Sequence, residues 1–229
     1  MKHFNSNFLK FKNIHVNESA ILFATGPTLN FFKFADFKLN EEKLIKVGVN
    51  SIVYKNDIQL DYYFCGHDAS KDNNHLHHLH LQNTLKQQII QQKINKQIFC
   101  CTNVDGSQNP FHFNEKDAHD MKAIPYAIHT NSGVDAFKKE ISENNLYNHS
   151  IVFSALQFIL YTGVTKVYLV GCDGGGGFSF LFPNNKWNDT VEWCWKEFIE
   201  YTNANHQNVE FISINPKKLK GLFLKEIYN

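Results

Sequence analysis

The sequence lacks any apolar run that approaches the ~20 residues needed to span a bilayer. Its first residues, MKHFNSNFLKFKN, lack the apolar core of a signal peptide. The charges almost balance, with a formal net charge of +1, which argues against a strong field for nucleic acid or membrane. We therefore expect a cytoplasmic protein that binds no nucleic acid. Peripheral contact with the inner membrane and a homo-oligomer both remain open.

Metal and disulfide patterns are also absent. The five cysteines include no Cys-x-x-Cys pair, so we expect reduced, buried thiols. The histidines of HLHHLH are the nearest approach to a metal site, because His77 and His80 have helical i, i+3 spacing, as do His75 and His78. No cysteine or acidic residue joins them cleanly, so a solvated helix face is the favoured interpretation. No metal site and no required cofactor are predicted.

What the sequence does contain is a series of short apolar runs that alternate with helical segments. Such alternation predicts an α/β protein with a Rossmann-like, mostly parallel sheet and helices on both faces. Two helices are expected at Ser150–Tyr161 and Val191–Thr202. The expected strands are Ser19–Ala24, Leu44–Val49, Tyr62–Cys65, Lys96–Cys101, Lys166–Val170 and Val209–Ile214.

The 229 residues suit one α/β domain, 1–229. A polar stretch with HLHHLHLQNTLKQQIIQQKIN at its centre predicts a helical insertion, and Asn103–Lys122 a long polar loop. We expect an inserted lid or subdomain over about 70–128.

Small and polar residues follow most of the predicted strands, at the sheet edge where α/β proteins bind ligands. Thr25-Gly26-Pro27-Thr28 could bring backbone and a helix N-terminus close to a phosphate, although it is neither GxGxxG nor a Walker A sequence. An ordinary strand-to-helix turn is equally consistent. Asn50, followed by Ser51, offers an amide to a base edge or a ribose, or it caps a turn.

Three further strand ends or loops carry candidates. In Gly66-His67-Asp68 the histidine is a candidate general base and the aspartate a candidate metal ligand, or a cap beside an exposed histidine. Asn131-Ser132-Gly133, after Thr130, suits a phosphate or base, or a helix N-cap. Gly171-Cys172-Asp173, followed by Gly174 and three more glycines, predicts either a loop that closes over a substrate or a flexible connector. Lys217, Lys218 and Lys220 suit phosphate or acidic lipid, but a solvated face is favoured.

These segments together resemble a known family. ILFATGPTLN, KVGVNS, LDYYFCGHD, HTNSGV, SALQFILYTGVTKVYLVGCDGG and ISINP follow one another in the order seen in bacterial family 42 sialyltransferases and their wider relatives. Those relatives include the motility accessory factor and MptE-like proteins. The resemblance covers most of the chain outside residues 70–128.

The resemblance implies a Rossmann-like sheet with a lid and a cytidine-nucleotide donor, CMP- or CDP-linked, at the strand ends. Gly26, Pro27 and Thr28 match the glycine turn, and Asn50 the asparagine that contacts the nucleotide. Ser132 and Gly133 match the end of a nucleotide-binding Thr-Ser-Gly segment, in which Asn131 replaces the threonine. Asp173 matches the last residue of a Gly-x-Asp motif.

The family's catalytic histidine has no counterpart, because FPNNKWNDTVEW contains none. The candidates for a base are therefore His67, Asp68, His149 and Asp189. The implied function is metal-independent transfer of a sugar acid or another group to a bacterial surface glycan, either capsule or lipooligosaccharide. Two alternatives are a pterin-type pyrophosphokinase that uses ATP and Mg²⁺, and a non-catalytic accessory protein on the same fold.

Overall fold

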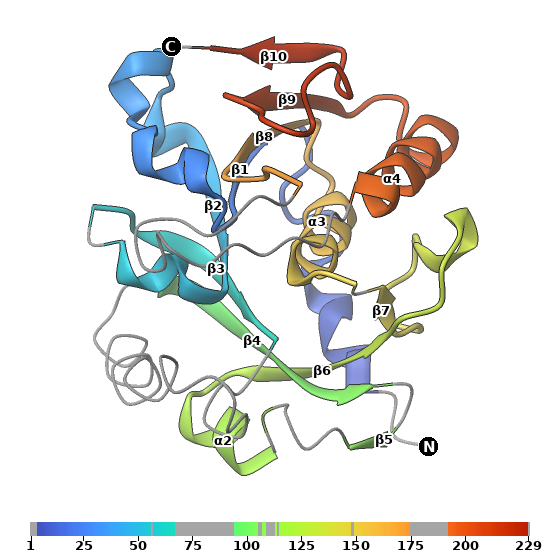
Figure 1. Cartoon of the computed structure of the whole chain (residues 1–229). Coiled ribbons are helices and arrows are strands. Elements are labelled where there is room, and N and C mark those ends of the chain that lie inside the picture. The colour runs from blue at the N-terminus through green and yellow to red at the C-terminus, as the bar shows by residue number, and fades with distance from the viewer. Residues whose placement is uncertain are drawn as a thin grey trace.

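A computed structural model describes residues 4–55, 57–66, 94–104, 107–108, 113, 115–147, 149–174 and 192–228. Within these residues the chain forms a single ten-stranded sheet with helices on both faces (Figure 1). The α/β, Rossmann-like fold predicted from the sequence is thus confirmed.

Nine of the strands run parallel, in the order β10-β9-β8-β1-β2-β3-β4-β6-β7, and the two-residue β5 (Ser107–Gln108) pairs antiparallel with β4. Because neighbours in this order pair in parallel, all nine carboxyl ends lie at one edge of the sheet. The nine strands are β1 (Ser19–Phe23), β2 (Leu44–Val49), β3 (Leu60–Cys65), β4 (Ile94–Val104), β6 (Ile124–His129), β7 (Leu146–Tyr147), β8 (Lys166–Val170), β9 (Glu210–Ile214) and β10 (Lys225–Ile227).

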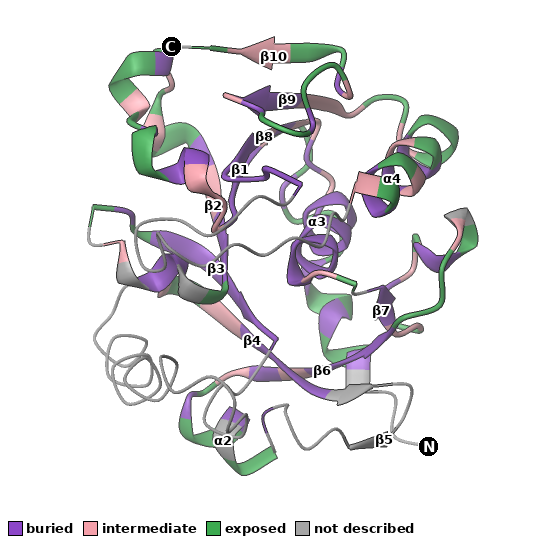
Figure 2. Ribbon diagram, in the orientation of Figure 1, coloured by how far each residue is buried: buried purple, intermediate pink, exposed green. Residues whose placement is uncertain are grey.

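Helices cover both faces, which explains why the central strands are apolar at successive positions instead of alternating (Figure 2). Every residue of β3 is buried. One face packs against η1 (Phe4–Phe11), α3 (Ile151–Tyr161) and α4 (Glu192–Asn205). The opposite face packs against η2 (Pro27–Phe31), η3 (Phe34–Phe37), η5 (Asn50–Tyr54) and α2 (Glu115–Asp120), while η4 (Glu41–Lys43) leads into β2.

Helix α3 is central to the first face, because all eleven of its residues are buried. The Phe158 ring lies 4.8 Å from the Phe99 ring and 4.9 Å from the Tyr62 ring, centroid to centroid. The rings of Phe8 and Phe11 on η1 extend this cluster. The polar N-terminal segment therefore belongs to the core through two aromatic side chains.

Strand β1 lies at the point where the chain reverses its direction across the sheet. From β1 the chain adds β2, β3, β4, β6 and β7 on one side, and β8, β9 and β10 then extend the other side. In open parallel sheets, ligands bind outside the carboxyl ends at such a switch point. The carboxyl ends of β1 and β8 are therefore the expected position of a ligand-binding site.

The range expected as an insertion, 70–128, contains β4, α2 and most of β6, and both strands pair within the main sheet. The loop expected over Asn103–Lys122 contains β5 and α2. Residues 67–93, which include the expected lid helix and its histidines, lie outside the described residues. Among the described residues, no helix is both long and apolar enough to cross a membrane.

Candidate functional site at the carboxyl edge

The loops after β1 and β8 contact each other directly. The Ala24 N–H donates to the Val170 carbonyl at 2.8 Å, and the Gly26 N–H donates to the Gly171 carbonyl at 2.9 Å. A Cβ on Gly26 would lie 2.4 Å from the Gly171 oxygen, and one on Gly171 would lie 2.4 Å from the Ala24 oxygen. Only glycine allows the two backbones to approach this closely.

The Asp173 side chain holds the loops after β1 and β8 together, and we call this contact between the two loops the β1–β8 junction. The Asp173 carboxylate accepts a hydrogen bond from the Thr28 N–H at 2.9 Å and from the Thr28 hydroxyl at 2.8 Å. Both residues are buried. The two positions are 145 residues apart in the chain, and the bonds between them join the two halves of the sheet at the switch point.

This geometry bears on the turn at 25–28, for which the sequence leaves two interpretations open. One is a helix N-terminus with free N–H groups for a phosphate, and the other is an ordinary strand-to-helix turn. The helix that follows is a five-residue 3₁₀ helix, and the Thr28 N–H is already bonded to Asp173. Thr28 and Asp173 thus shape the loop, while Thr25, Gly26 and Pro27 remain half-buried at its surface.

Burial raises the pKa of Asp173, although the hydrogen bonds from Thr28 and the positive charge of Lys217 oppose that rise. Lys217 follows β9 and is exposed, so it places a cation beside the junction at the carboxyl edge. Gly174, with a φ of +71°, packs on Leu219 from the same segment.

The neighbouring strand ends carry the next two candidates. Asn50, after β2, is exposed and adopts the left-handed conformation with a φ of +48°. Its carbonyl accepts a hydrogen bond from the Tyr63 hydroxyl at 2.6 Å, which holds the turn. The Ser51 side chain lies outside the described atoms. Gly66, after β3, is buried, and a Cβ there would lie 2.9 Å from the Ile151 side chain.

The segment after β6 is held by a hydrogen bond to helix α4, a contact that the sequence analysis did not predict. The Gly133 N–H donates to Oε1 of Glu197, on α4, at 3.0 Å. The Asn131 and Ser132 side chains are exposed beside it. We did not predict Glu197 from the sequence, because only the folded chain brings residues 133 and 197 together.

His149 is the one proposed base within the described residues. It is exposed just ahead of α3, with its ring centroid 4.8 Å from that of the exposed Trp193 and 5.3 Å from that of Tyr147. The Tyr147 hydroxyl lies 3.5 Å from Oε2 of Glu197, so His149 and the 131–133 segment share one neighbourhood. His67, Asp68 and Asp189 lie outside the described residues.

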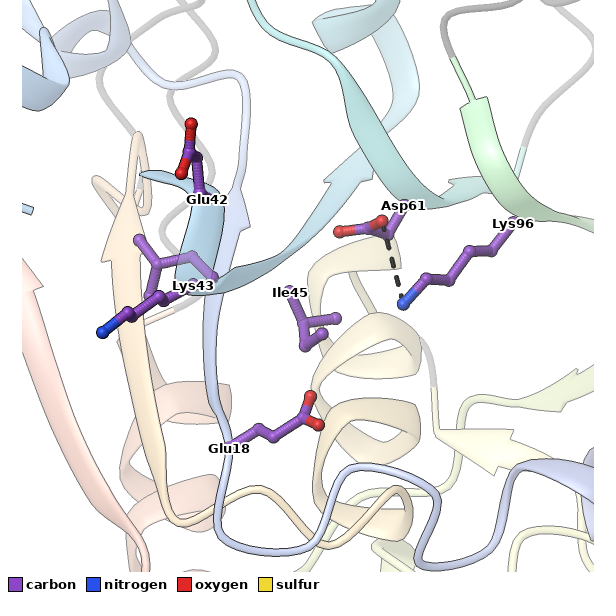
Figure 3. A pocket seen from close by; sticks show the side chains of 7 residues that line it. Glu18, Glu42, Lys43, Ile45, Asp61 and Lys96 are labelled. Carbon is purple, nitrogen blue, oxygen red and sulfur yellow. Dashed lines mark ion pairs between the residues drawn. The ribbon is translucent and has the colours of Figure 1, made fainter. Parts of the chain in front are cut away.

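A pocket of a different kind lies at the opposite, amino edge of the sheet (Figure 3). It is lined by side chains of both charges, and Asp61 and Lys96 approach each other across it at 3.8 Å. Asp61 also accepts a hydrogen bond from the Lys46 N–H. Its location is wrong for a ligand of a parallel sheet, so it is not our candidate. Within the described ranges, no group of three metal-binding side chains occurs.

No protein-family model matches the sequence, and no curated protein matches it. Solved structures do resemble it. The MAf glycosyltransferase from Magnetospirillum magneticum AMB-1 superposes with a TM-score of 0.55 at 10% identity, over 99% of this chain. The chain therefore shares its fold with this protein.

Two Campylobacter jejuni structures support that description. The alpha-2,3-sialyltransferase in apo form has a TM-score of 0.52 at 15% identity, over 94% of this chain and 84% of its own. The sialyltransferase CstII in complex with cytidine-5'-monophosphate has a TM-score of 0.51 at 17% identity, over 86% and 80%. By contrast, the chain spans only 37% of the length of the Magnetospirillum protein. At these identities the likeness establishes the fold.

Proposed function

We propose that the chain is a transferase that binds a nucleotide-activated donor at the carboxyl edge of its sheet and modifies a bacterial surface glycan. The observation that carries this proposal is the junction of the 24–28 and 171–174 loops at the switch point, beside the exposed Asn50 at the end of the adjacent strand β2. A cytidine nucleotide is the donor we favour, because CstII, which has a similar fold, was solved with CMP.

The edge offers different chemistry at different places. Lys217 supplies a cation near the β1–β8 junction, which suits the phosphate of the donor. Asn50 and the 131–132 side chains supply amides and a hydroxyl, which suit a ribose or a base. In this proposal one of the bases expected from the sequence removes the proton from an acceptor hydroxyl. That oxygen bonds to the transferred group as the bond to the donor phosphate breaks, and the nucleotide leaves.

The competing functions have less support among the described residues. A pyrophosphokinase needs carboxylates that face Mg²⁺ and ATP phosphates, and the Asp173 oxygens are directed at Thr28. An accessory protein without catalysis needs no exposed base at the edge, where His149 lies. Both alternatives give distinct outcomes in the following test.

The test is a thermal-shift series with CMP, CDP, UDP, GDP and ATP with Mg²⁺. A ligand that binds the folded chain stabilises it by RT ln(1 + [L]/Kd), which is about 2.7 kcal/mol at a hundredfold excess over Kd. We expect cytidine nucleotides to raise the melting temperature most. A Mg²⁺-dependent shift with ATP alone would favour the kinase, and no shift with any nucleotide at millimolar concentration would favour the accessory role.

The variant Asn50→Gly tests whether the nucleotide binds at the end of β2. Glycine keeps the left-handed backbone while it removes the amide, so we expect the variant to fold normally and to lose most of the CMP-induced shift. The matched control is Asn17→Gly, because Asn17 is also exposed and left-handed, with a φ of +64°, but precedes β1 at the opposite edge. Equal CMP-induced shifts in the two variants would contradict a nucleotide site at Asn50.

A further inference from the structure

The loop between β6 and η7 (Val134–Ala136) is held at one residue from two sides. The Gly133 N–H donates to Glu197 at 3.0 Å, and the Gly133 carbonyl accepts from the Ala136 N–H at 2.9 Å. Gly133 has a φ of +107°, a conformation that residues with a side chain rarely adopt. The two residues before it, Asn131 and Ser132, consequently present exposed side chains from a fixed turn.

Glu197 is itself well placed to act as an anchor. It lies on α4, whose residues Cys194, Trp195 and Phe198 are buried in the core. Its second carboxylate oxygen lies 3.5 Å from the Tyr147 hydroxyl at the end of β7. Figure 1 shows the segment that follows β6 reaching across to α4. The Glu197 carboxylate therefore links the 130–133 turn to helix α4, which is packed in the core.

The charge of Glu197 decides which part of a nucleotide this turn can accept. A free N–H beside a glycine turn attracts phosphate, but here that N–H is occupied by a carboxylate, which repels an anion. Lys217, by contrast, lies near the β1–β8 junction and attracts one. Phosphate is favoured at the junction and disfavoured at the 130–133 turn.

We propose that Glu197 is a positioning residue of the donor site, which orients the 130–133 turn and reserves it for the uncharged nucleoside end of the donor. This inference rests on the proposed function, since it takes the ligand to be a nucleotide. It adds an orientation: base or ribose at Asn131 and Ser132, and phosphate towards Lys217.

The experiment measures cytidine and CMP affinities by calorimetry for the wild type, Glu197→Ala and Glu197→Gln. Alanine leaves Gly133 without its acceptor, so we expect both affinities to fall about tenfold. Glutamine keeps an oxygen for the Gly133 N–H but removes the charge. We expect its cytidine and CMP affinities both to stay within about twofold of the wild type, because the phosphate lies away from this residue.

The control is Glu200→Gln, because Glu200 is an exposed glutamate on the same helix, and we expect both affinities to stay unchanged. Wild-type protein that binds neither ligand would overturn the proposed function together with this inference. Wild-type binding that Glu197→Ala leaves intact would overturn the inference alone. A rise in the ratio of CMP to cytidine affinity in Glu197→Gln would place the phosphate beside Glu197 and overturn the orientation, and this arm remains decisive if the alanine variant does not fold.

Discussion

Gly26 lies where a single added carbon would collide with two other groups. A Cβ there would lie 2.3 Å from Oδ2 of Asp173 and 2.4 Å from the Gly171 carbonyl oxygen. The second of these atoms is backbone in a loop that already bonds to Gly26. A side-chain rotation therefore cannot remove the clash with the Gly171 oxygen.

We predict that Gly26→Ala lowers the free energy of unfolding by about 3 kcal/mol through this overpacking. Gly221→Ala is the control, because Gly221 has a φ of +79° but open space around it, and it should cost about 1 kcal/mol from backbone strain alone. Urea denaturation of both variants measures the difference. A smaller loss for Gly26→Ala than for Gly221→Ala would contradict the close approach of the two loops.

At the residue scale the sequence located important positions but not their roles. Gly26, Thr28, Gly171 and Asp173 were candidates for ligand contact, and the structure joins them to one another at the switch point. Spacing along the chain cannot reveal a hydrogen bond between residues 28 and 173. The same reason hid Glu197, whose partner Gly133 lies 64 residues away.

Among the elements, α3 was the easiest to predict and the most consequential for the core. Its sequence IVFSALQFILY is apolar on nearly every side, as a helix between a sheet and other helices requires. Phe158 near its middle contacts rings from η1, β3 and β4.

We predict that Phe158→Ala lowers the free energy of unfolding by about 4 kcal/mol, because it leaves a cavity among aromatic rings that cannot collapse together. The control Phe31→Ala removes a ring that is 64% exposed, and it should change stability by less than about 0.5 kcal/mol. Chemical denaturation of both variants is the measurement. Similar losses for the two would contradict the central place of α3.

Other elements were missed for physical reasons. Strand β6 contains Pro125 and follows a polar stretch, so its short apolar run lacked a clear strand pattern. Strands β7 and β10 have two and three residues, too few for any periodicity. Helix η1 is polar apart from the aromatic positions and Leu9, and only tertiary packing reveals that two of its rings are core.

At the scale of the whole molecule, the alternation of strands and helices was enough to predict the parallel sheet. The order of the strands was not predictable from the sequence, because it depends on which strands pair in the folded chain. That order places β1 beside β8 and so creates the junction fastened by Asp173.

The junction predicts a pH dependence of global unfolding. Burial raises the pKa of Asp173 above its value in the unfolded chain, so the folded state holds this proton to higher pH. The stabilisation from that proton is complete below the ordinary pKa of 3.8 and is lost as the pH rises through the raised value. We expect the stability of the wild type minus that of Asp173→Asn to decrease from about pH 4 upward.

Denaturant unfolding of the two proteins at a series of pH values measures this difference, and the other titrating groups cancel in the subtraction. A difference that increases with pH would mean that the Thr28 hydrogen bonds outweigh burial and lower the pKa instead. A flat difference would mean that the two effects balance.

The two margins of the sheet have a consequence for self-association. β7 and β10, the outermost strands, offer only two and three residues of backbone, whereas a partner strand needs a longer row of unpaired N–H and C=O groups. Within the described residues, edge-to-edge β-augmentation by a second copy therefore has little template. Any dimer of this chain should bury helices or loops, and the margins themselves should resist amyloid-like stacking.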